Sequence, residues 1–430
     1  MTRVEILSNS DTVGGASRAA YRLYRALQTC ATDIHMTVAD KRTDDWGVHG
    51  PANVLEKAKR YLHPRIAGRL TALQRTGNTC PHSLNLLPSN MAANINRSTV
   101  DLVNMHWVGG ETLSIEDMGN IHKPQVWTFH DMWALCGAEH FSDDGPDARW
   151  RTGYFAHNRL AGAKGPDLDR FTWNRKRRAW KKPVQVVTPS RWLADCVRQS
   201  VLMNDWPVAV IPNVLQTDVF KPLDRAHSRH ALNLPLDRQI VLFGALGGTR
   251  DPRKGYSLLL EALNVLAARG APILCVVFGQ GEPRQALPLP FAVKWMGHVS
   301  DDTTLALLYS ASDVMVTPSK MENLPQSATE AQACGCPVVA FHCTGLPEVV
   351  EHLTTGYLAR PFDPVDLAHG IAWVLADPVR HAALGRAARD RAQRLWSPQV
   401  VVSAYLSLYG SVIDACRRAG QARVQTSVQG

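Results

Sequence analysis

Residues 317–337 read Thr317-Pro-Ser-Lys-Met-Glu322-Asn-Leu-Pro325-Gln-Ser-Ala-Thr-Glu330-Ala-Gln-Ala-Cys-Gly335-Cys-Pro. Proline fits the first turn of a helix and glycine fits its end, so the stretch predicts a helix between Pro325 and Gly335. Glu322 then precedes the helix, and Glu330 lies five residues into it, about 7 Å further along at ~1.5 Å per residue. The helix N-terminus between the two carboxylates favours a diphosphate. A capping or ion-paired glutamate pair is the alternative interpretation.

Short apolar segments rich in Val and Ile alternate with longer amphipathic segments throughout the chain. They predict a first series of strands at residues 4–7, 102–105, 126–129, 184–188 and 208–211, and a second at 240–243, 273–278, 293–296, 314–317 and 338–341. Most are hydrophobic on both faces, which suits strands buried between helices. Alternation with helices indicates parallel pairing, so an α/β fold with two parallel sheets is expected.

The boundary between the two series is expected near residue 213, where Pro212 and Pro222 interrupt the pattern. We expect an N-terminal domain at residues 1–213 and a linker at 214–238, of which 224–238 looks like a polar connector. A C-terminal domain follows at 239–396. A last helix is expected at 397–420 and a frayed tail at 421–430.

The composition indicates an ordinary globular chain. Of 430 residues, 45% are hydrophobic and 20% are charged, which excludes a disordered, collagen-like or coiled-coil protein. No apolar run approaches the ~20 residues that span a bilayer, and the first residues do not resemble a secretory signal. The nine cysteines form no CxxC motif, so a cytoplasmic chain with reduced thiols is expected.

The positive charge is concentrated in the first half of the chain. Residues 1–213 carry 27 Lys and Arg against 20 Asp and Glu, a net charge of +7, and residues 214–430 carry 20 against 18, a net charge of +2. The first half therefore predicts an anionic partner. No nucleic-acid recognition motif accompanies the charge, so we expect a phosphate or a membrane surface and no nucleic acid.

Two basic segments could supply a membrane surface. Seven cations lie in the thirteen residues 170–182, where Trp173 and Trp180 share a helix face. A second segment, residues 57–75, carries apolar side chains on one face, namely Leu62, Ile66, Leu70 and Leu73. Both patterns suit an anionic bilayer. A solvated helix whose tryptophans pack inward is the alternative for the first segment.

Three further groups could bind a ligand. Gly14 and Gly15 follow a strand and open a helix, which allows a ligand to approach the backbone, although a plain tight turn explains them equally well. His130-Asp131 ends another strand, where His130 could bind a sugar hydroxyl or be a satisfied structural histidine. The loop from Gly244 to Gly255 contains Arg250, Arg253 and Lys254, which suit a diphosphate, or it is a solvated basic loop.

No metal site is predicted. Potential ligand atoms occur in two groups without repeated zinc-ligand spacing, His130, Cys136, Glu139 and His140, and Cys334, Cys336, His342 and Cys343. Cys334 and Cys336 flank a glycine before a buried strand, so they are expected to pack as small hydrophobic residues. No Walker motif occurs, which disfavours an ATPase mechanism.

Glu322 and Glu330 resemble the E-x7-E motif of retaining GT-B glycosyltransferases, specifically glycosyltransferase family 4. The resemblance spans nearly the whole chain, because further motifs follow in the family's order, at residues 14–15, 130–131, 188–190, 211–222, 254–255, 279–281 and 345–348. The segment at residues 130–137 resembles members that build bacterial surface polysaccharides.

The resemblance implies two facing Rossmann-like domains, with the acceptor bound by the N-terminal domain and a UDP- or GDP-sugar by the C-terminal one. The final helix would return to the N-terminal domain. Metal would not be needed. Residue by residue, the implied contacts are Lys254 with the diphosphate, Glu322 and the backbone of Asn323 and Leu324 with the sugar, Glu330 with the ribose, His130 with the donor sugar, and Gly15 with the donor.

Two departures from the family pattern occur. Ala245 stands where the family often has arginine, so Arg250 or Arg253 is expected to replace that phosphate contact. The family's Asn-Gly becomes Asn213-Val214, which alters only a linker turn. We expect a cytoplasmic, peripherally membrane-bound enzyme that transfers sugar to a lipid-linked saccharide. The alternatives are an epimerase, a phosphorylase or a noncatalytic nucleotide-sugar-binding protein.

Overall fold

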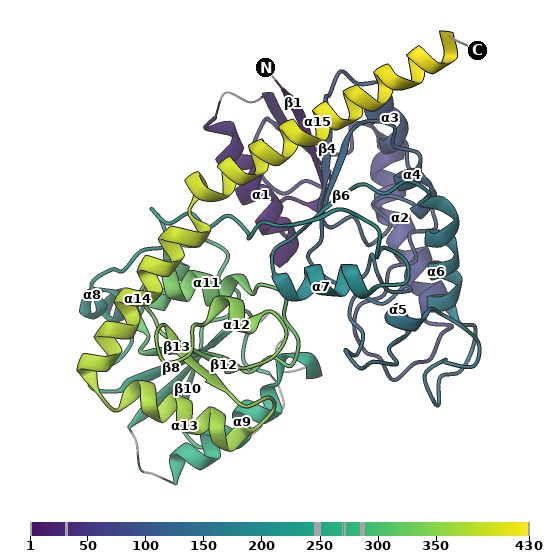
Figure 1. The fold of residues 1–430 in the computed structure, drawn as a ribbon. Coiled ribbons are helices and arrows are strands. Elements are labelled where there is room, and N and C mark those ends of the chain that lie inside the picture. Colours follow the sequence, from purple (N-terminus) through teal and green to yellow (C-terminus); the bar gives the residue numbers. More distant parts are fainter. Residues whose placement is uncertain are drawn as a thin grey trace. The chain divides into compact units, whose positions relative to one another are not determined.

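The computed structural model describes residues 2–30, 33–244, 251–268, 270, 272–283 and 289–428. The chain divides into two compact units (Figure 1). Unit 1 comprises residues 1–211 and 402–430, and unit 2 comprises residues 212–401. Each unit is built around one parallel β-sheet that carries helices on both faces, which confirms the predicted α/β fold with two parallel sheets.

Unit 1 contains a seven-stranded sheet in the order β3-β2-β1-β4-β5-β6-β7. Its strands are β1 Arg3–Ser10, β2 Asp33–Asp40, β3 Val48–His49, β4 Leu102–Met105, β5 Gln125–Thr128, β6 Gln185–Thr188 and β7 Val208–Val210. Its helices are α1 Gly15–Gln28, α2 Val54–Thr71, α3 Met91–Arg97, α4 Ile115–Gly119, α5 Arg149–Thr152, α6 Leu168–Ala179 and α7 Arg191–Gln199.

Unit 2 contains a six-stranded sheet in the order β10-β9-β8-β11-β12-β13. Its strands are β8 Gln239–Gly244, β9 Ile273–Phe278, β10 Ala292–Trp295, β11 Val314–Thr317, β12 Val338–Phe341 and β13 Gly356–Ala359. The short helix η1 spans Pro252–Lys254, and the α-helices are α8 Arg225–Ala231, α9 Tyr256–Ala267, α10 Asp302–Ala311, α11 Gln326–Ala333, α12 Leu346–Val349, α13 Pro364–Leu375 and α14 Pro378–Trp396, followed by α15 Pro398–Val428.

The strand order reverses at one position in each sheet. Chain order runs outward in one direction from β1 and in the other from β4, and likewise from β8 and β11. Ligands of open parallel sheets bind outside the carboxyl ends of the strands at such a switch point. The loops that follow β1 and β4, and those that follow β8 and β11, are therefore the places to examine for a site.

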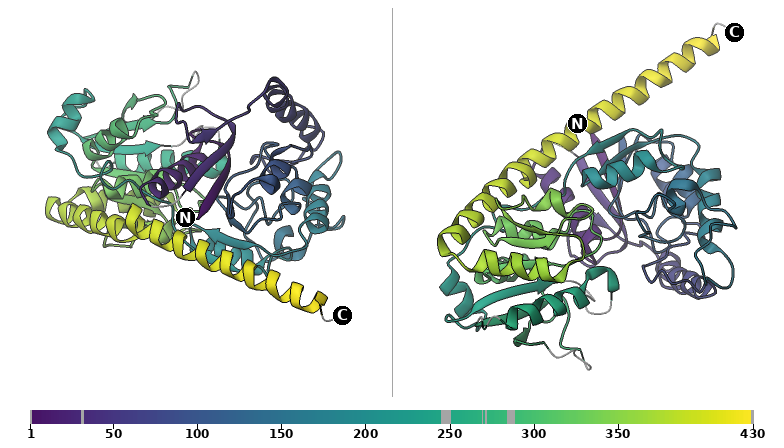
Figure 2. Two further views of the ribbon diagram at one scale, coloured as in Figure 1. Left: turned by 90° about the horizontal axis from the view of Figure 1, so that it is seen from above. Right: turned by 60° about the horizontal axis from the view of Figure 1, so that its bottom comes forward.

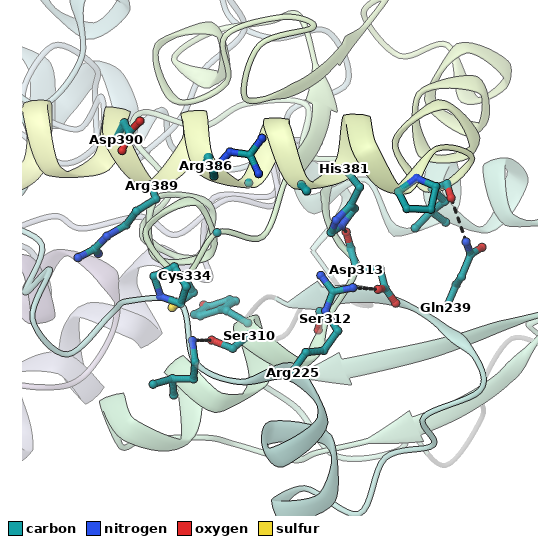
Figure 3. Close-up of a pocket in the computed structure, with 18 residues that line it drawn as sticks. Arg225, Gln239, Ser310, Ser312, Asp313, Cys334, His381, Arg386, Arg389 and Asp390 are labelled. Carbon is teal, nitrogen blue, oxygen red and sulfur yellow. Dashed lines mark hydrogen bonds and ion pairs between the residues drawn. The ribbon is translucent and has the colours of Figure 1, made fainter.

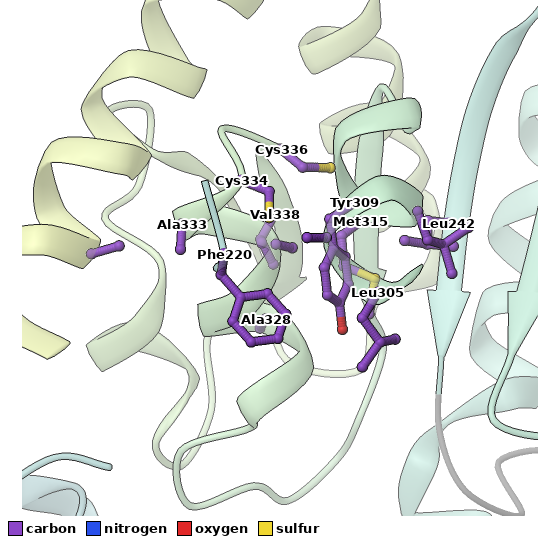
Figure 4. Close-up of a cluster of buried hydrophobic side chains, with 14 of the residues drawn as sticks. Phe220, Leu242, Leu305, Tyr309, Met315, Ala328, Ala333, Cys334, Cys336 and Val338 are labelled. Atoms are coloured by element: carbon purple, nitrogen blue, oxygen red, sulfur yellow. The ribbon is translucent and has the colours of Figure 1, made fainter. Parts of the chain in front are cut away.

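The strands of unit 2 are buried on both faces, as their apolar sequences predict. Leu242 and Met315 point into a core shared with α10 and α11 (Figure 4). Their neighbours Phe243 and Val316 point to the other face and pack with α9 and α13. Because side chains alternate along a strand, an uninterrupted apolar run supplies both cores at once.

Helix α15 belongs to unit 1 from Val402 onward. The hydroxyl of Tyr409 accepts a hydrogen bond from the Asn104 side chain of β4 at 2.7 Å, and Tyr405 lies 3.2 Å from the Thr128 hydroxyl of β5. The helix continues without a break towards the C-terminus in both views of Figure 2. It ends at Val428, so the predicted tail at residues 421–430 is wrong for its described part.

Residues 378–419 are long and apolar enough to cross a membrane by length and composition alone. The segment consists of α14 and the first part of α15, which are separated at Ser397. Trp396, Tyr405 and Tyr409 are buried in the fold. A core helix of a soluble protein passes the same test, so this feature carries little weight.

The linker between the sheets is more structured than its polar sequence predicts. Residues 225–231 form helix α8, whose Arg229 is buried and donates to the Asp313 carboxylate at 2.6 Å. Leu215 and Phe220 lie in the core of unit 2 (Figure 4 labels Phe220). The residues from 214 to 238 are therefore part of unit 2, and the predicted polar connector is wrong.

Three strands in the described part of the chain lie outside the predicted series. β2 alternates buried and half-buried residues, because one face of this strand is less deeply covered. β3 has only two residues, and β13 begins with Gly356 and has only four. None of the three shows the long apolar run that identified the other strands.

The basic helix α6 does not present its tryptophans to solvent. Trp173 and Trp180 are buried, and the Trp180 indole donates to the Ile115 carbonyl at 3.0 Å. Lys176 is fully buried and donates to the carbonyls of Trp133, Cys136 and Gly137. Burial lowers the pKa of Lys176 to about 7. The prediction that this helix offers tryptophans to a membrane is therefore wrong.

We expect Phe220→Ala to destabilise unit 2 strongly. The side chain is fully buried in the core, and truncating a buried phenylalanine costs about 3–5 kcal/mol. Urea titration followed by intrinsic fluorescence should show the transition of unit 2 at a lower urea concentration. Leu236→Ala is the control, because Leu236 is 66% exposed in the same connecting segment. Equal shifts in the two variants would contradict the placement of Phe220.

Candidate functional site

The centre of the candidate site is an ion pair between the loops that follow β8 and β11. The Lys254 Nζ lies 2.6 Å from the Glu322 Oε1, and both side chains are largely buried. Lys254 ends η1, and Gly255 follows it with a φ of +68°. A Cβ on Gly255 would lie 1.9 Å from the Pro318 carbonyl oxygen, so only glycine lets the two loops approach this closely.

A second close approach fixes Glu322 from the other side. Its backbone N–H donates to the Thr344 hydroxyl at 3.0 Å, and its carbonyl accepts from the Gly345 N–H at 2.9 Å. A Cβ on Gly345 would lie 1.6 Å from the Asn323 carbonyl oxygen. The loop that carries Glu322 is therefore held between two glycines, one from each neighbouring loop.

Glu322 is a buried carboxylate that stays charged. Burial by itself would raise its pKa, but the cations Lys254 and Arg253 outweigh that effect, so the pKa of Glu322 is lowered. Arg253 is itself oriented by Asp251, whose carboxylate lies 2.8 Å from the Arg253 Nη2. The site thus combines two cations with one carboxylate outside the switch point of the sheet.

The second carboxylate of the motif is deeper. Glu330 lies in α11 with 2% of its surface exposed, and it accepts a hydrogen bond from the Tyr309 hydroxyl at 2.8 Å. Ala328 and Ala331 beside it are fully buried. Pro325 precedes the first helical residue, and Gly335 follows the helix with a φ of +73°, as the sequence predicts.

The remaining donor-site predictions fall at three places in unit 2. Asn323 and Leu324 are buried in the loop between Glu322 and α11. Arg253 lies next to Lys254 in η1. Arg250 and Ala245 lie outside the described residues.

In unit 1, two histidines meet at the carboxyl ends of β4 and β5. The His106 Nδ1 lies 2.9 Å from the His130 Nε2, and their rings stack. Desolvation lowers the pKa of His130 to about 4 even though Asp131 is close, and it lowers that of buried His106 well below its usual value. Both imidazoles are therefore neutral at physiological pH, and the N–H of one ring donates a hydrogen bond to the unprotonated nitrogen of the other.

Asp131 holds the loop after β5 in place. Its Oδ2 lies 2.7 Å from the His140 Nδ1 and accepts the Trp107 indole N–H at 2.8 Å. Burial opposes ionisation, but these partners keep the pKa of Asp131 below its usual value. The His140 Nε2 lies 2.7 Å from the Ser83 hydroxyl, which also accepts the Gly110 N–H at 3.0 Å. Ser83 is buried and makes both of these hydrogen bonds. The series of hydrogen bonds from Asp131 through His140 to Ser83 therefore positions the loop, and Ser83 is not a nucleophile.

Gly15 is the first residue of α1, directly after Gly14 with its φ of +85°. A Cβ on Gly14 would meet no atom within 4 Å. Beneath this turn, buried Asp11 accepts the backbone N–H groups of Arg42 and Thr43. These bonds fix the loop after β1 against the loop after β2.

The structure also contains a cavity of about 640 Å³ in unit 2 (Figure 3). It lies at the opposite edge of the sheet, because Gln239 begins β8 and Asp313 directly precedes β11. Its cation Arg225 is paired with Asp313 at 2.8 Å, and Arg389 donates to backbone carbonyls. The charges of Arg225, Asp313 and Arg389 are thus engaged within the fold.

In the described part of the chain, no three His, Cys, Asp or Glu residues are arranged to hold a metal ion. Cys334 and Cys336 lie in the core of unit 2, where they pack as small hydrophobic residues, as predicted (Figure 4). Burial raises the pKa of both thiols, so neither is poised to act as a thiolate ligand.

Three partners of the site are not apparent from the sequence. Tyr309 looks like one more apolar position of α10, and Thr344 like a turn residue, yet they bind Glu330 and the backbone of Glu322. Asp251, the N-cap residue of η1, orients Arg253. Asp251 lies in the loop after the switch-point strand β8, whereas Tyr309 lies in α10 before β11 and Thr344 in the loop after β12. Position relative to the switch point therefore signals Asp251 but not the other two.

Two family models match the chain. Residues 224–391 match the family described as glycosyl transferases group 1, and residues 13–219 match glycosyltransferase family 4. Both halves of the chain are therefore glycosyltransferase domains.

Similar curated proteins include the D-inositol 3-phosphate glycosyltransferases of Saccharomonospora viridis and Mycolicibacterium vanbaalenii. The first is 33% identical over 46% of this chain and 48% of its own length, and the second is 36% identical over 45% of each. The chain thus spans about half the length of the curated relatives it matches.

Solved structures share the fold over most of the chain. A sucrose-phosphate synthase from Thermosynechococcus elongatus matches with a TM-score of 0.65 and 19% identity, covering 96% of this chain and 100% of that one. HepE from Anabaena, in complex with UDP-glucose, matches with a TM-score of 0.64 and 17% identity over the same shares. These similarities establish a GT-B fold.

The neutral histidine pair predicts a loss of stability in acid. The pKa of His130 is about 4 in the fold against 6.5 when unperturbed, so below pH 6.5 the unfolded chain binds protons that the folded chain does not. Stability should therefore fall progressively from about pH 6.5 to 4. In the variant His106→Asn/His130→Asn, the drop in Tm between pH 7 and pH 5 should be smaller than in the wild type. The exposed His227→Asn is the control, and an unchanged drop in the double variant would contradict the neutral pair.

Proposed function

We propose that this chain is a retaining glycosyltransferase that transfers a sugar from a UDP- or GDP-sugar to a saccharide acceptor. The Lys254–Glu322 ion pair at the switch point of unit 2 carries the proposal. A cation next to a helix N-terminus suits a diphosphate, and a buried carboxylate beside it suits sugar hydroxyls. UDP-glucose is bound in the Anabaena neighbour, which favours a UDP-sugar over a GDP-sugar as the donor.

We assign each protein group to a part of the donor according to its charge and its burial. Lys254 and Arg253 would bind the diphosphate, because Lys254 pairs with Glu322 in the loop that leads into α11 and Arg253 is next to it. Glu322, with the backbone of Asn323 and Leu324, would bind the sugar. Buried Glu330, oriented by Tyr309, would accept the ribose hydroxyls. These cations would neutralise the leaving group, so activity should persist in EDTA.

The proposed reaction proceeds on one face of the anomeric carbon. The bond from that carbon to the diphosphate oxygen breaks, the acceptor oxygen forms the new bond, and the acceptor proton passes to the departing diphosphate. Lys254 and Arg253 would stabilise the charge that develops on the diphosphate. Glu322 is paired with Lys254 at 2.6 Å and is assigned to hydroxyls, so it is not the nucleophile. Neutral His130 would act as a hydrogen-bonding group in transfer.

The acceptor side of the proposal concerns unit 1. We propose a lipid-linked saccharide acceptor of bacterial polysaccharide or glycoconjugate synthesis, used at the inner face of the cytoplasmic membrane. The excess positive charge of residues 1–213 supports an anionic surface as partner. A screen of UDP- and GDP-sugars by thermal shift would identify the donor, since a ligand of the folded state raises Tm.

Replacing Lys254 tests the donor site. Charge-assisted hydrogen bonds contribute about 1.5–3 kcal/mol, and about 1.4 kcal/mol corresponds to a factor of ten. Lys254→Ala should therefore lower kcat/KM about ten- to a hundredfold. Lys320→Ala is the matched control, because Lys320 is an exposed cation next to the same loop. Wild-type kinetics in the Lys254 variant would exclude this lysine from the phosphate site.

The stereochemical outcome tests the reaction itself. Proton NMR of the product should show the anomeric configuration of the donor, since attack and departure share one face. A double displacement would instead leave a glycosylated carboxylate on the enzyme, which mass spectrometry of the enzyme incubated with donor would detect. An inverted product would refute retention, and a glycosylated Glu322 peptide would replace same-face attack by a covalent route.

A further inference from the structure

Helix α2 of unit 1 exposes an unusual amount of apolar surface. Leu55, Leu62, Ile66 and Leu70 of the helix, and Leu73 just after it, are between 37% and 63% exposed, and Ala67 is the buried residue of the helix. A helix on the surface of a globular protein ordinarily turns its apolar side chains inward. In α2 the large apolar residues lie outside, so the fold alone does not account for them.

These side chains form one stripe. Leu55, Leu62 and Ile66 are seven and four residues apart, which places them on the same face of α2, and Leu70 follows one turn later. Leu73 lies two residues beyond the end of the helix at Thr71. The helix is tied to the rest of unit 1 by one contact in its first half and one just beyond its last residue. Arg60 pairs with Asp40 at the carboxyl end of β2, and the Gln74 amide donates to the Asp169 carboxylate at 2.7 Å. The stripe is therefore held on a rigid element.

Positive charge surrounds the stripe. Residues 54–75 contain six Lys and Arg against one Glu, which gives a net charge of +5. Arg60 is paired with Asp40. The other five, which pair with no carboxylate in the described part of the chain, are Lys57, Lys59, Arg65, Arg69 and Arg75. We call the five apolar residues and these five cations the α2 surface.

We propose that the α2 surface docks on an anionic lipid bilayer, with its leucines and isoleucine in the headgroup region. An apolar stripe flanked by cations matches such an interface in both hydrophobicity and charge. A second copy of this chain fits worse, because a twofold interface brings the same patch against itself and would oppose five cations with five.

The position of α2 suits a membrane-bound acceptor. The pairing of Arg60 with Asp40 places the helix at the carboxyl edge of the unit 1 sheet, and the loops that carry Gly15 and His130 leave this same edge. A lipid-linked saccharide would thus be presented close to those loops. This consequence rests on the proposed function, whereas lipid binding itself does not.

Vesicle binding by the full chain tests the proposal. In flotation without donor or acceptor, the wild type should bind vesicles of phosphatidylcholine and phosphatidylglycerol at 3:1 and bind pure phosphatidylcholine at least tenfold more weakly. Salt at 0.5 M should weaken binding, since exposed charges are screened beyond about 3–10 Å between 1 and 0.1 M. Equal binding to both vesicles would overturn the electrostatic part of the proposal.

Two variants separate the parts of the surface. Leu62→Ser/Ile66→Ser should lower binding to the anionic vesicles about tenfold or more, and Arg65→Ser/Arg69→Ser should lower it and reduce its salt dependence. The matched controls are Leu236→Ser in unit 2 and Arg177→Ser/Arg178→Ser in α6, which change exposed side chains elsewhere. If the α6 variant loses binding and the α2 variants retain it, the assignment to α2 is refuted.

Light scattering and transferase assays complete the test. A wild-type dimer that Leu62→Ser/Ile66→Ser converts to a monomer would assign the surface to a second copy and overturn the lipid proposal. Activity on a soluble acceptor should stay unchanged in all α2 variants. Loss of that activity would instead place α2 in the acceptor site. Because flotation needs no substrate, a failed assay of transfer leaves the lipid result standing.

Discussion

The buried pair of Lys254 and Glu322 is the constraint on which the rest of unit 2 depends. Moving two charges out of water is expensive, and removing one partner of such a pair costs about 3–5 kcal/mol because the other remains buried and uncompensated. Their loops must therefore approach closely, which only Gly255 and Gly345 permit. A diphosphate that binds Lys254 would compete with Glu322, and the sugar hydroxyls would then supply the partners that the carboxylate loses.

At the carboxyl edge of the unit 1 sheet, two neutral histidines lie next to a charged aspartate. His106 and His130 meet ring to ring and are neutral, while Asp131 next to them is charged and bound by His140 and Trp107. A charged His130 would be buried beside a second imidazole, so the fold favours the neutral form. The edge can thus offer hydrogen bonds without a net cation, in contrast to the Lys254 loop of unit 2.

The sequence was sufficient wherever one interaction dominates a segment. Uninterrupted apolar runs identified most strands, because burial on both faces leaves no other composition possible. The alternating β2 and the very short β3 and β13 were not predicted, because none of them contains such an apolar run. The sequence also placed Glu322 and Glu330 on either side of a helix start. It could not indicate Tyr309 or Thr344, because these residues reach Glu330 and Glu322 only when α10 and the loop after β12 pack beside the two glutamates.

Composition misled most where charge was counted without its location. The cations of α6 and α2 contribute alike to the net charge of residues 1–213, yet Lys176 lies in the interior and Arg175 binds Glu116 and two backbone carbonyls. Part of the positive charge of residues 1–213 therefore forms contacts inside unit 1 and is not a basic surface. What distinguishes α2 is the exposure of leucines between its cations. Because water penalises such leucines and lipid does not, apolar exposure indicates a partner surface better than net charge does.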